Sequence, residues 1–454
     1  MNVSTAGNLD VAGPMRGQEL RRALRFSDLV VYGMVFMLPI APFSLFGIVN
    51  RASNGLVPLA YMMGAVVMAF TARSYGLLSA RIPLAGSVYT YTRMGLNETF
   101  GFLAGWLILL DYLIAPGLMY VISAASLHGL VPQVARWEWI VVFTIVGTSM
   151  NVVGIQFAAR ANKTMLVAML VVLLIFLAVG TAALVAGKGA GALRFDMLFD
   201  AQRFAWPAMG TAILISSTNF LGFDAITTLA EEVVLERRPL IGWAGLTTLA
   251  IIAALFFVQC WVAAALVPGA AIRSDDTAFY DIAGYAGGSW LYTLTSVTTA
   301  LAFGISCAVV CQSAIARILF AMGRDRQIPA ILARLHPRTK QPYVANICVG
   351  CVSLVIGLFF QDRIADLALF QNFGALSAFV LVNASVIGFF WVRHGERSVF
   401  AHLVTPLVGM VANLALLLAM RLETLILGAA WLAVGLIYIV VLRLVLRRSV
   451  SIEA

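Results

Sequence analysis

The chain has 454 residues, of which 61% are hydrophobic and 11% are charged, and its formal net charge is +9. Because soluble domains usually carry about 25% charged residues, this composition excludes an ordinary soluble protein and indicates an integral membrane protein. The basic residues are scattered through short loops, so we attribute the net charge to membrane topology and expect no nucleic-acid partner.

Twelve apolar runs are long enough to cross a bilayer, which takes about 20 residues. The polar segment 1–26 precedes them and lacks the pattern of a cleavable signal peptide. We expect spans at 27–50, 56–80, 98–127, 138–157, 162–187, 207–231, 240–267, 289–322, 342–361, 365–392, 402–420 and 424–447.

An even number of spans places both termini on one side of the membrane, and the distribution of Lys and Arg identifies that side. With the termini inside, 22 of the 30 Lys and Arg residues lie inside and eight fall in outer loops. The positive-inside rule therefore predicts cytoplasmic tails, 1–26 and 448–454, in a bacterial-type inner membrane. The eight outer residues are Arg51, Arg136, Lys188, Arg194, Arg203, Arg273, Arg363 and Arg421.

Two prolines three residues apart, Pro39 and Pro42, interrupt the first expected span. A proline is tolerated in the first turn of a helix, so we predict that a second half-helix begins near Pro42. Its free backbone amides and the positive end of its dipole would suit an anionic group. The alternative is a simple proline kink, which membrane helices tolerate.

The sixth expected span is interrupted by the polar stretch SSTNFLGFDAITTLAEE, residues 216–232. Polar groups in hydrocarbon must face protein or a hydrated cavity, and a polar break containing glycine points to a transporter's substrate site. Asp224 within the break would pair with a substrate ammonium or titrate with coupling protons. The alternative is that Asp224 caps the restarted half-helix.

The two interrupted spans start five spans apart, which is typical of two inverted repeats with a site at their interface. We therefore expect a transporter core at 27–392, built from repeats 27–187 and 207–392. The last two spans, 402–447, would be peripheral helices. This prediction depends on hydropathy and on the positions of the breaks, since no residue-level repeat is visible.

Further candidate residues lie in the third span and around the second break. Asp111 is either a second acid of the site or a partner for a neighbouring helix. Tyr112 offers a ring face, on which a cation gains about 0.5–2 kcal/mol. Phe220 and Phe223 flank the break and would close over a substrate, although packing alone would also explain them.

The remaining polar residues of the break have two further expected roles. Thr218 and Asn219 can bond to a ligand or to the unwound backbone. Glu231 and Glu232 fall about two turns beyond Asp224, near the cytoplasmic end, where we expect them to form gate salt bridges with loop arginines.

The sequence predicts no metal, no cofactor and no enzymatic activity. Cys307 and Cys311 lie one helical turn apart, but no His or further Cys completes a metal site. We expect all five cysteines to be small buried hydrophobes. The helices carry no catalytic motif, and the chain carries no nucleotide-binding loop.

Two short helices are expected outside the spans. One lies near residues 82–91, between the second and third spans, and dips into the cytoplasmic side. The other lies in the outer loop from Arg273 to Asp281, as a surface helix facing incoming substrate.

Six stretches carry a resemblance to a known family. They are AGSVYTYTR (85–93), GFLAGWLILLDYL (101–113), FLGFDAITTLAEE (220–232), MGRD (322–325), HPRTKQP (336–342) and NFGALSAFVLVNASV (372–386). In these stretches the chain resembles the amino acid–polyamine–organocation superfamily, and more narrowly its bacterial putrescine importer branch. The resemblance implies an all-α fold of 12 transmembrane helices, a LeuT-like five-plus-five inverted repeat with broken helices 1 and 6.

The chain departs from the family pattern in the first helix and in the fifth. Amino acid transporters of the superfamily carry a Gly-Ser-Gly type break, where this chain has Pro39, Ile40, Ala41 and Pro42. Putrescine importers carry an acid where this chain has Ser44, which removes one partner for a diamine. We therefore expect the break residues to shape the site without charge. Some proton-coupled relatives carry a lysine within the fifth helix, but here the fifth span has none beyond its cytoplasmic start.

The sequence therefore predicts a secondary active importer of a small organic cation, a putrescine-like diamine, driven by protons through alternating access. An amino acid permease of the same superfamily is the alternative. A channel, which needs a continuous polar pore, and a non-transporting sensor are distant alternatives. The expected partners are an amine or amino acid substrate, the proton and the lipid bilayer, and we expect a monomer or a dimer.

Overall fold

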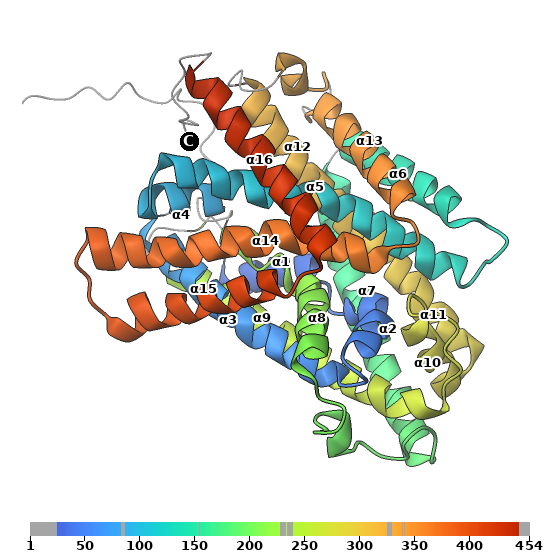
Figure 1. Cartoon of the computed structure of the whole chain (residues 1–454). Coiled ribbons are helices and arrows are strands. Elements are labelled where there is room, and N and C mark those ends of the chain that lie inside the picture. The colour runs from blue at the N-terminus through green and yellow to red at the C-terminus, as the bar shows by residue number, and fades with distance from the viewer. Residues whose placement is uncertain are drawn as a thin grey trace, which may run out of the picture.

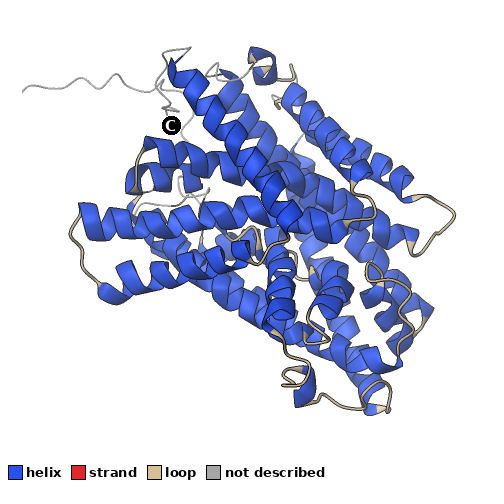
Figure 2. Cartoon of the chain, in the orientation of Figure 1, coloured by secondary structure: helices blue, strands red, loops and turns tan. Residues whose placement is uncertain are grey.

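The computed structural model describes residues 25–82, 87–153, 155–227, 233, 239–324, 329–337, 339 and 341–444. Every secondary-structure element within these ranges is a helix (Figure 2). This confirms the prediction of an all-α protein. The C-terminal tail 448–454, nearly all of the N-terminal tail 1–26, and the gate residues Glu231 and Glu232 lie outside the described residues.

In the first half of the chain, the described residues form seven α-helices. They are α1 (Phe26–Met37), α2 (Pro42–Ala52), α3 (Val57–Arg81), α4 (Ser87–Gly95), α5 (Glu98–His128), α6 (Arg136–Val153) and α7 (Ile155–Val185).

In the second half, the residues that the structure describes form nine α-helices and several short 3₁₀ or π segments. They are η1 (Phe195–Met197), α8 (Trp206–Ser217), η2 (Thr218–Phe220), α9 (Pro239–Leu266), η5 (Val267–Gly269), α10 (Ala278–Gly287), α11 (Ser289–Leu301), η6 (Ala302–Cys307), α12 (Ala308–Arg324), η7 (Ala330–Ala333), α13 (Tyr343–Phe359), α14 (Ile364–Val386), η8 (Ile387–Arg393), η9 (Val399–Val404), α15 (Thr405–Leu418) and α16 (Leu422–Leu444).

Eight helical segments in the described residues are long and apolar enough to cross a membrane. The pair α1 and α2 forms a ninth candidate, which is bent by 57°. The other three expected spans correspond to α6, α8 and α13, which have 18, 12 and 17 residues. The described residues thus form a helical bundle with eight or nine candidate membrane spans.

The first predicted break is confirmed. Helix α1 ends at Met37, Leu38 adopts φ 50°, and α2 begins at Pro42, as the ring geometry of proline favours. The expectation of free amides at this point is wrong for three of them. The N–H groups of Ala41, Phe43 and Ser44 donate to the carbonyls of Leu38, Ile40 and Ala41 at 2.8, 2.9 and 3.1 Å. A tight turn, rather than an anion, satisfies these donors.

The second break follows α8, which stops at Ser217 and continues as one 3₁₀ turn. Gly222 has φ +115°, a conformation that a residue with a side chain rarely adopts. A Cβ at this position would lie 2.5 Å from Cδ1 of Phe36, on the last turn of α1. Only glycine lets the two breaks approach this closely.

The helices around the breaks form one packed bundle (Figure 1). Helix α3 packs along α9, α14 packs across α5, and α2 lies beside α8. Helix α15 covers α14, and α16 contacts both α5 and α14. The broken helices are therefore enclosed by long continuous ones, which supply the walls of the site.

The two short helices expected outside the spans are present as α4 and α10, but they differ from the expectation in bounds and in burial. The first, α4, spans Ser87–Gly95, and residues 83–86 of the expected stretch lie outside the described residues. The second, α10, begins at Ala278 rather than at Arg273, and it is not a surface helix. Its residues Phe279 and Asp281 are buried, because α10 packs against α2, α7 and α11.

Candidate functional site

A cavity lies between the two breaks, enclosed by α1, α2, α5, α14 and the π segment η6. It offers about 40 Å³ to the centres of water-sized spheres. Since one water needs about 10–15 Å³ by this measure, the cavity holds about three waters. Six of the predicted site residues line it: Ala41, Asp111, Tyr112, Thr218, Asn219 and Asp224.

Two buried carboxylates are the most polar part of the cavity wall. Asp111, on α5, accepts a hydrogen bond from Nε2 of Gln371 on α14 at 2.7 Å. Asp224 lies in the second break, and its Oδ2 is 3.5 Å from the hydroxyl of Tyr112, at the long limit for a hydrogen bond. The cavity thus joins an acid from a continuous helix to an acid from a broken one.

The surroundings of Asp224 bear on both of its expected roles. The backbone amides of Gly222, Asp224 and Ala225 lie near its carboxylate, as they would around a helix cap. The carbonyl of Asp224 accepts from Oγ1 of Thr227 at 2.7 Å, which closes the turn after the break. The same side chain also lines the cavity.

No Lys, Arg or His lies among the described residues that line this cavity. A buried charge is costly unless an opposite charge or hydrogen bonds compensate it. Two carboxylates without a basic side chain beside them therefore favour a positively charged ligand.

Thr218 and Asn219 line the cavity and also hold the second break in place. Nδ2 of Asn219 donates to the hydroxyl of Tyr61 at 2.7 Å. Oγ1 of Thr218 accepts from Nδ2 of Asn372 at 2.7 Å. Both side chains thus bond to side chains of α3 and α14, whereas the expected alternative to a ligand was the unwound backbone.

Three residues predicted from the first break do not line the cavity: Pro39, Ile40 and Ser44. The carbonyl of Pro39 instead accepts from Nε2 of Gln259 on α9 at 2.9 Å. Oγ of Ser44 donates to the carbonyl of Ala41 at 2.8 Å, so it stabilises the start of α2. Of the four predicted residues in this break, the structure brings only Ala41 to the cavity wall.

Phe220 and Phe223 are also absent from the cavity wall. The ring of Phe220 packs on Phe256 with centroids 5.1 Å apart. The ring of Phe223 packs on Phe379 at 5.4 Å and edge-on against Tyr75 at 5.8 Å. Their surroundings match the packing alternative.

Sequence reasoning missed fourteen further lining residues, among them Phe36, Gly222, Phe303, Cys307, Cys311 and Gln371. Gln371 stands directly before the NFGALSAFVLVNASV stretch, and a glutamine inside an apolar span was a signal that could have identified it. Nothing in the apolar pattern distinguishes Phe36 or Phe303 from ordinary core residues.

The cysteines follow the prediction only in part. Cys260, Cys307 and Cys311 are buried, but Cys348 and Cys351 on α13 are exposed on the surface of the bundle, which corrects the expectation for these two. Sγ of Cys307 lies 3.9 Å from Sγ of Cys311, and both residues line the cavity.

A wider hollow lies along α2, α8 and α14. It offers about 600 Å³ to the same water-sized spheres. Its walls include Ile48 and Ile215, each about one helical turn along the chain from a residue of the cavity wall, and Leu369, which lies close to Gln371 on α14. Two ion pairs lie among its lining residues, with Arg51 3.1 Å from Asp275 and Arg421 3.3 Å from Asp366. A polar hollow thus approaches the cavity along the same helices.

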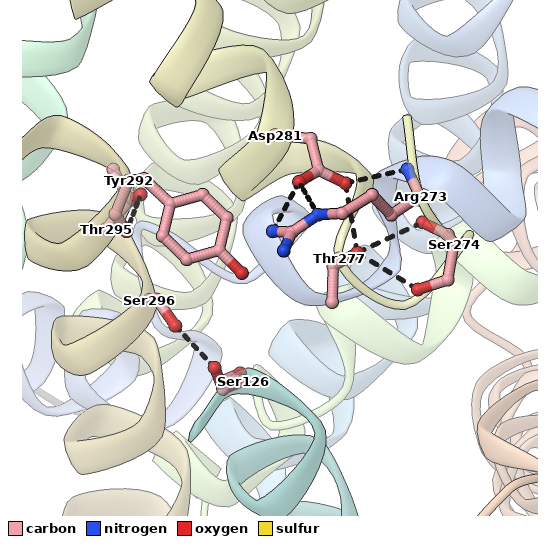
Figure 3. Close-up of polar contacts among 8 residues, drawn as sticks. All are labelled: Ser126, Arg273, Ser274, Thr277, Asp281, Tyr292, Thr295 and Ser296. Carbon is pink, nitrogen blue, oxygen red and sulfur yellow. Dashed lines mark hydrogen bonds and ion pairs between the residues drawn. The ribbon is translucent and has the colours of Figure 1, made fainter. Parts of the chain in front are cut away.

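The segment before α10 is held by a buried carboxylate (Figure 3). Oδ1 of Asp281 accepts from Nε of Arg273 at 2.8 Å, and Oδ2 accepts from Oγ1 of Thr277 at 3.0 Å. The guanidinium also lies over the ring of Tyr292, 4.9 Å from its centroid. These contacts raise the pKa of Arg273 above its ordinary value, mainly through the bond to Asp281.

The broken helices, the buried acids and the apolar bundle agree with a comparison of sequences. A family model described as amino acid permease matches residues 28–445. The chain belongs to this amino acid permease family. The resemblance to the amino acid–polyamine–organocation superfamily is thereby confirmed, and the permease is a membrane transporter rather than an enzyme.

Three relatives cover nearly the whole permease. It is 32% identical to the low-affinity putrescine importer PlaP of Escherichia coli (strain K12) over 433 residues, 93% of each chain. It is 31% identical to an uncharacterised transporter of Mycobacterium bovis, over 95% of the permease and 93% of that protein. It is 25% identical to the branched-chain amino acid permease BcaP of Bacillus subtilis (strain 168), over 94% of each chain.

Proposed function

We propose that the permease imports a small organic cation, a putrescine-like diamine, across a bacterial cytoplasmic membrane. The observation that carries this proposal is the pair of carboxylates, Asp111 and Asp224, in a cavity whose described lining residues include no basic side chain. The similarity to a putrescine importer over 93% of the chain supports the same substrate class.

In this proposal each carboxylate takes one ammonium group of the diamine. Asp224 pairs with the first ammonium, and the hydroxyl and ring of Tyr112 beside it add polar and cation–π contacts. Asp111 pairs with the second ammonium. Asp111 thereby supplies the negative charge that putrescine importers carry in the first helix, at the position where this chain has Ser44.

The first break supports a diamine over an amino acid. An amino acid would bring a carboxylate, which needs free donors such as the amides at the start of a half-helix. Here the amides of Ala41, Phe43 and Ser44 already donate to carbonyls of the same turn. The relation to a branched-chain amino acid permease keeps an amino acid as the alternative substrate.

The proposed architecture completes this function. Twelve spans would form two inverted repeats, 27–187 and 207–392, with 402–447 as peripheral helices and both termini cytoplasmic. The repeats would rock around the two breaks to give alternating access. Asp224 would titrate with the coupling proton, Glu231 and Glu232 would form the cytoplasmic gate, and the permease would work as a monomer or a dimer.

Uptake into reconstituted vesicles tests this proposal. Radiolabelled putrescine should accumulate against its gradient when the vesicle lumen is more alkaline than the medium, and a protonophore should stop it. Leucine and arginine, tested as competitors, should not reduce uptake. Accumulation of an amino acid instead would establish the alternative, and downhill flux that ignores the proton gradient would indicate a channel.

A further inference from the structure

Gln371 places an unused hydrogen-bond acceptor at the wall of the cavity. Its Nε2 donates to Oδ1 of Asp111 at 2.7 Å. Its Oε1 is buried and accepts no hydrogen bond from any described protein group. A buried amide oxygen without a donor is unfavourable, most of all inside a membrane.

The orientation of the Gln371 amide follows from its neighbour. Turning the amide would place Oε1 against the carboxylate of Asp111, and two acceptors would then face each other. With Asp111 ionised, as the proposed function requires, the nitrogen points to Asp111, and the oxygen is the atom left over. Gln371 thus extends the acceptor surface of the acid by one further oxygen.

Two other buried amides near the breaks also have an unpartnered oxygen, but they do not line the cavity. Gln259 donates to the carbonyl of Pro39 at 2.9 Å, and Asn372 donates to the carbonyl of Leu214 at 2.7 Å. Both hold backbone carbonyls of a broken helix. Of these three amides, only Gln371 lines the cavity and is bonded to a carboxylate.

We infer that Oε1 of Gln371 accepts an N–H from the substrate's ammonium group while Nε2 holds Asp111, so that the site selects amines with at least one N–H over quaternary ammonium ions. This inference rests on the proposed function, that is, on a cationic substrate in this cavity. A cavity that holds about three waters must widen to admit a four-carbon diamine, and Gln371 is one of the side chains that form its wall. A quaternary ammonium offers no N–H, so it would leave this oxygen without a donor.

The test uses two ligands of nearly equal size and charge. One is 1,4-diaminobutane dimethylated at both ends, which keeps one N–H on each nitrogen. The other is trimethylated at both ends and has none. Calorimetry on the purified full-length permease gives the two affinities, and their ratio measures the preference for N–H.

The variant Gln371→Met removes the acceptor with little change in side-chain volume. We expect its affinity ratio to be about tenfold lower than the wild-type ratio, the size of one charge-assisted hydrogen bond. Gln371→Leu also removes the acceptor and should lower the ratio to a similar extent. Gln259→Met is the matched control, because it deletes a similar buried amide away from the cavity wall, and it should retain the wild-type ratio.

Three outcomes would overturn the inference. If both ligands weaken equally in Gln371→Met and the ratio stays at the wild-type value, Gln371 only positions Asp111. If Gln371→Met does not fold, the inference fails when Gln371→Leu keeps the wild-type ratio. A wild-type permease that binds neither ligand contradicts the proposed function, and the inference with it.

Discussion

The ring of Phe279, on α10, stacks on the ring of Phe43, on α2, with centroids 3.9 Å apart. Phe176 of α7 packs against Phe279 at 4.6 Å, and Phe46 of α2 packs edge-on at 5.8 Å. Helix α2 contributes Leu45 to the cavity wall, directly after the turn that contains Ala41. The stack therefore connects α10 to the half-helix beside the cavity.

Removing this stack should loosen the end of the bundle that carries α10. We expect Phe279→Ala to cost about 3–5 kcal/mol of stability, as deletion of a buried aromatic ring typically does. A thermal unfolding scan measures this cost. The same variant should admit a thiol reagent to Cys307 faster than the wild type. The control is Phe257→Ala. Phe257 and Trp261 both lie on α9, where their rings pack on each other, and removing this contact should leave the labelling rate unchanged.

Asp224→Asn should nearly abolish putrescine binding. Removing one partner of a buried ion pair typically costs about 3–5 kcal/mol, because the other charge is left uncompensated. Calorimetry gives the affinity, and thermal unfolding shows whether the protein remains folded. Normal affinity with early unfolding would make Asp224 a helix cap alone. Normal affinity with loss of uphill uptake would reassign it to proton coupling.

Substitutions at Tyr112 should separate the hydroxyl from the ring. Tyr112→Phe loses only a hydroxyl that lies 3.5 Å from Asp224, so we expect less than about tenfold weaker putrescine binding. Tyr112→Ala also loses the ring face, on which a cation gains about 0.5–2 kcal/mol, and should weaken binding more. Equal affinities of both variants and the wild type would show that Tyr112 only fills space.

The cavity thiols provide a direct test of the site. Cys307 and Cys311 line the cavity, whereas Cys348 is exposed on α13 and Cys260 is buried elsewhere. A small cationic methanethiosulfonate should modify the cavity pair, and saturating putrescine should slow this reaction. Mass spectrometry of the peptides identifies the modified thiols. Modification of Cys348 should be unaffected by putrescine, and equal rates at Cys307 with and without it would contradict a shared cavity.

The orientation predicted from the Lys and Arg distribution can be tested by cysteine labelling. A cysteine at Ala201, in the exposed loop before α8, should react with an impermeant thiol reagent added to intact cells. A cysteine at Leu335, which is 42% exposed in the loop after α12, should react only after the cells are opened. The background carries Cys348→Ser and Cys351→Ser. The reverse pattern would invert the topology.

Much of the fold could be predicted from the sequence because a bilayer imposes strong local rules. Apolar length identified the long helices, and Pro42 and Gly222 marked both breaks, since each has a backbone constraint that neighbouring residues do not alter. Asp111 and Asp224 stood out because a carboxylate in an apolar span is costly wherever the chain folds.

Only the tertiary structure decided which of these residues share a cavity. Ser44 and Phe223 lie within a few residues of Ala41 and Asp224, yet one bonds its own helix and the other packs on Phe379. Gln371 is 260 positions from Asp111 and still meets it at 2.7 Å. The apolar runs and the helix breaks depend on each residue and its near neighbours in the sequence. The direction in which a side chain points, and the residue that it contacts, depend instead on how distant helices pack. The sequence therefore determined the helices and the interruptions, and packing determined the site.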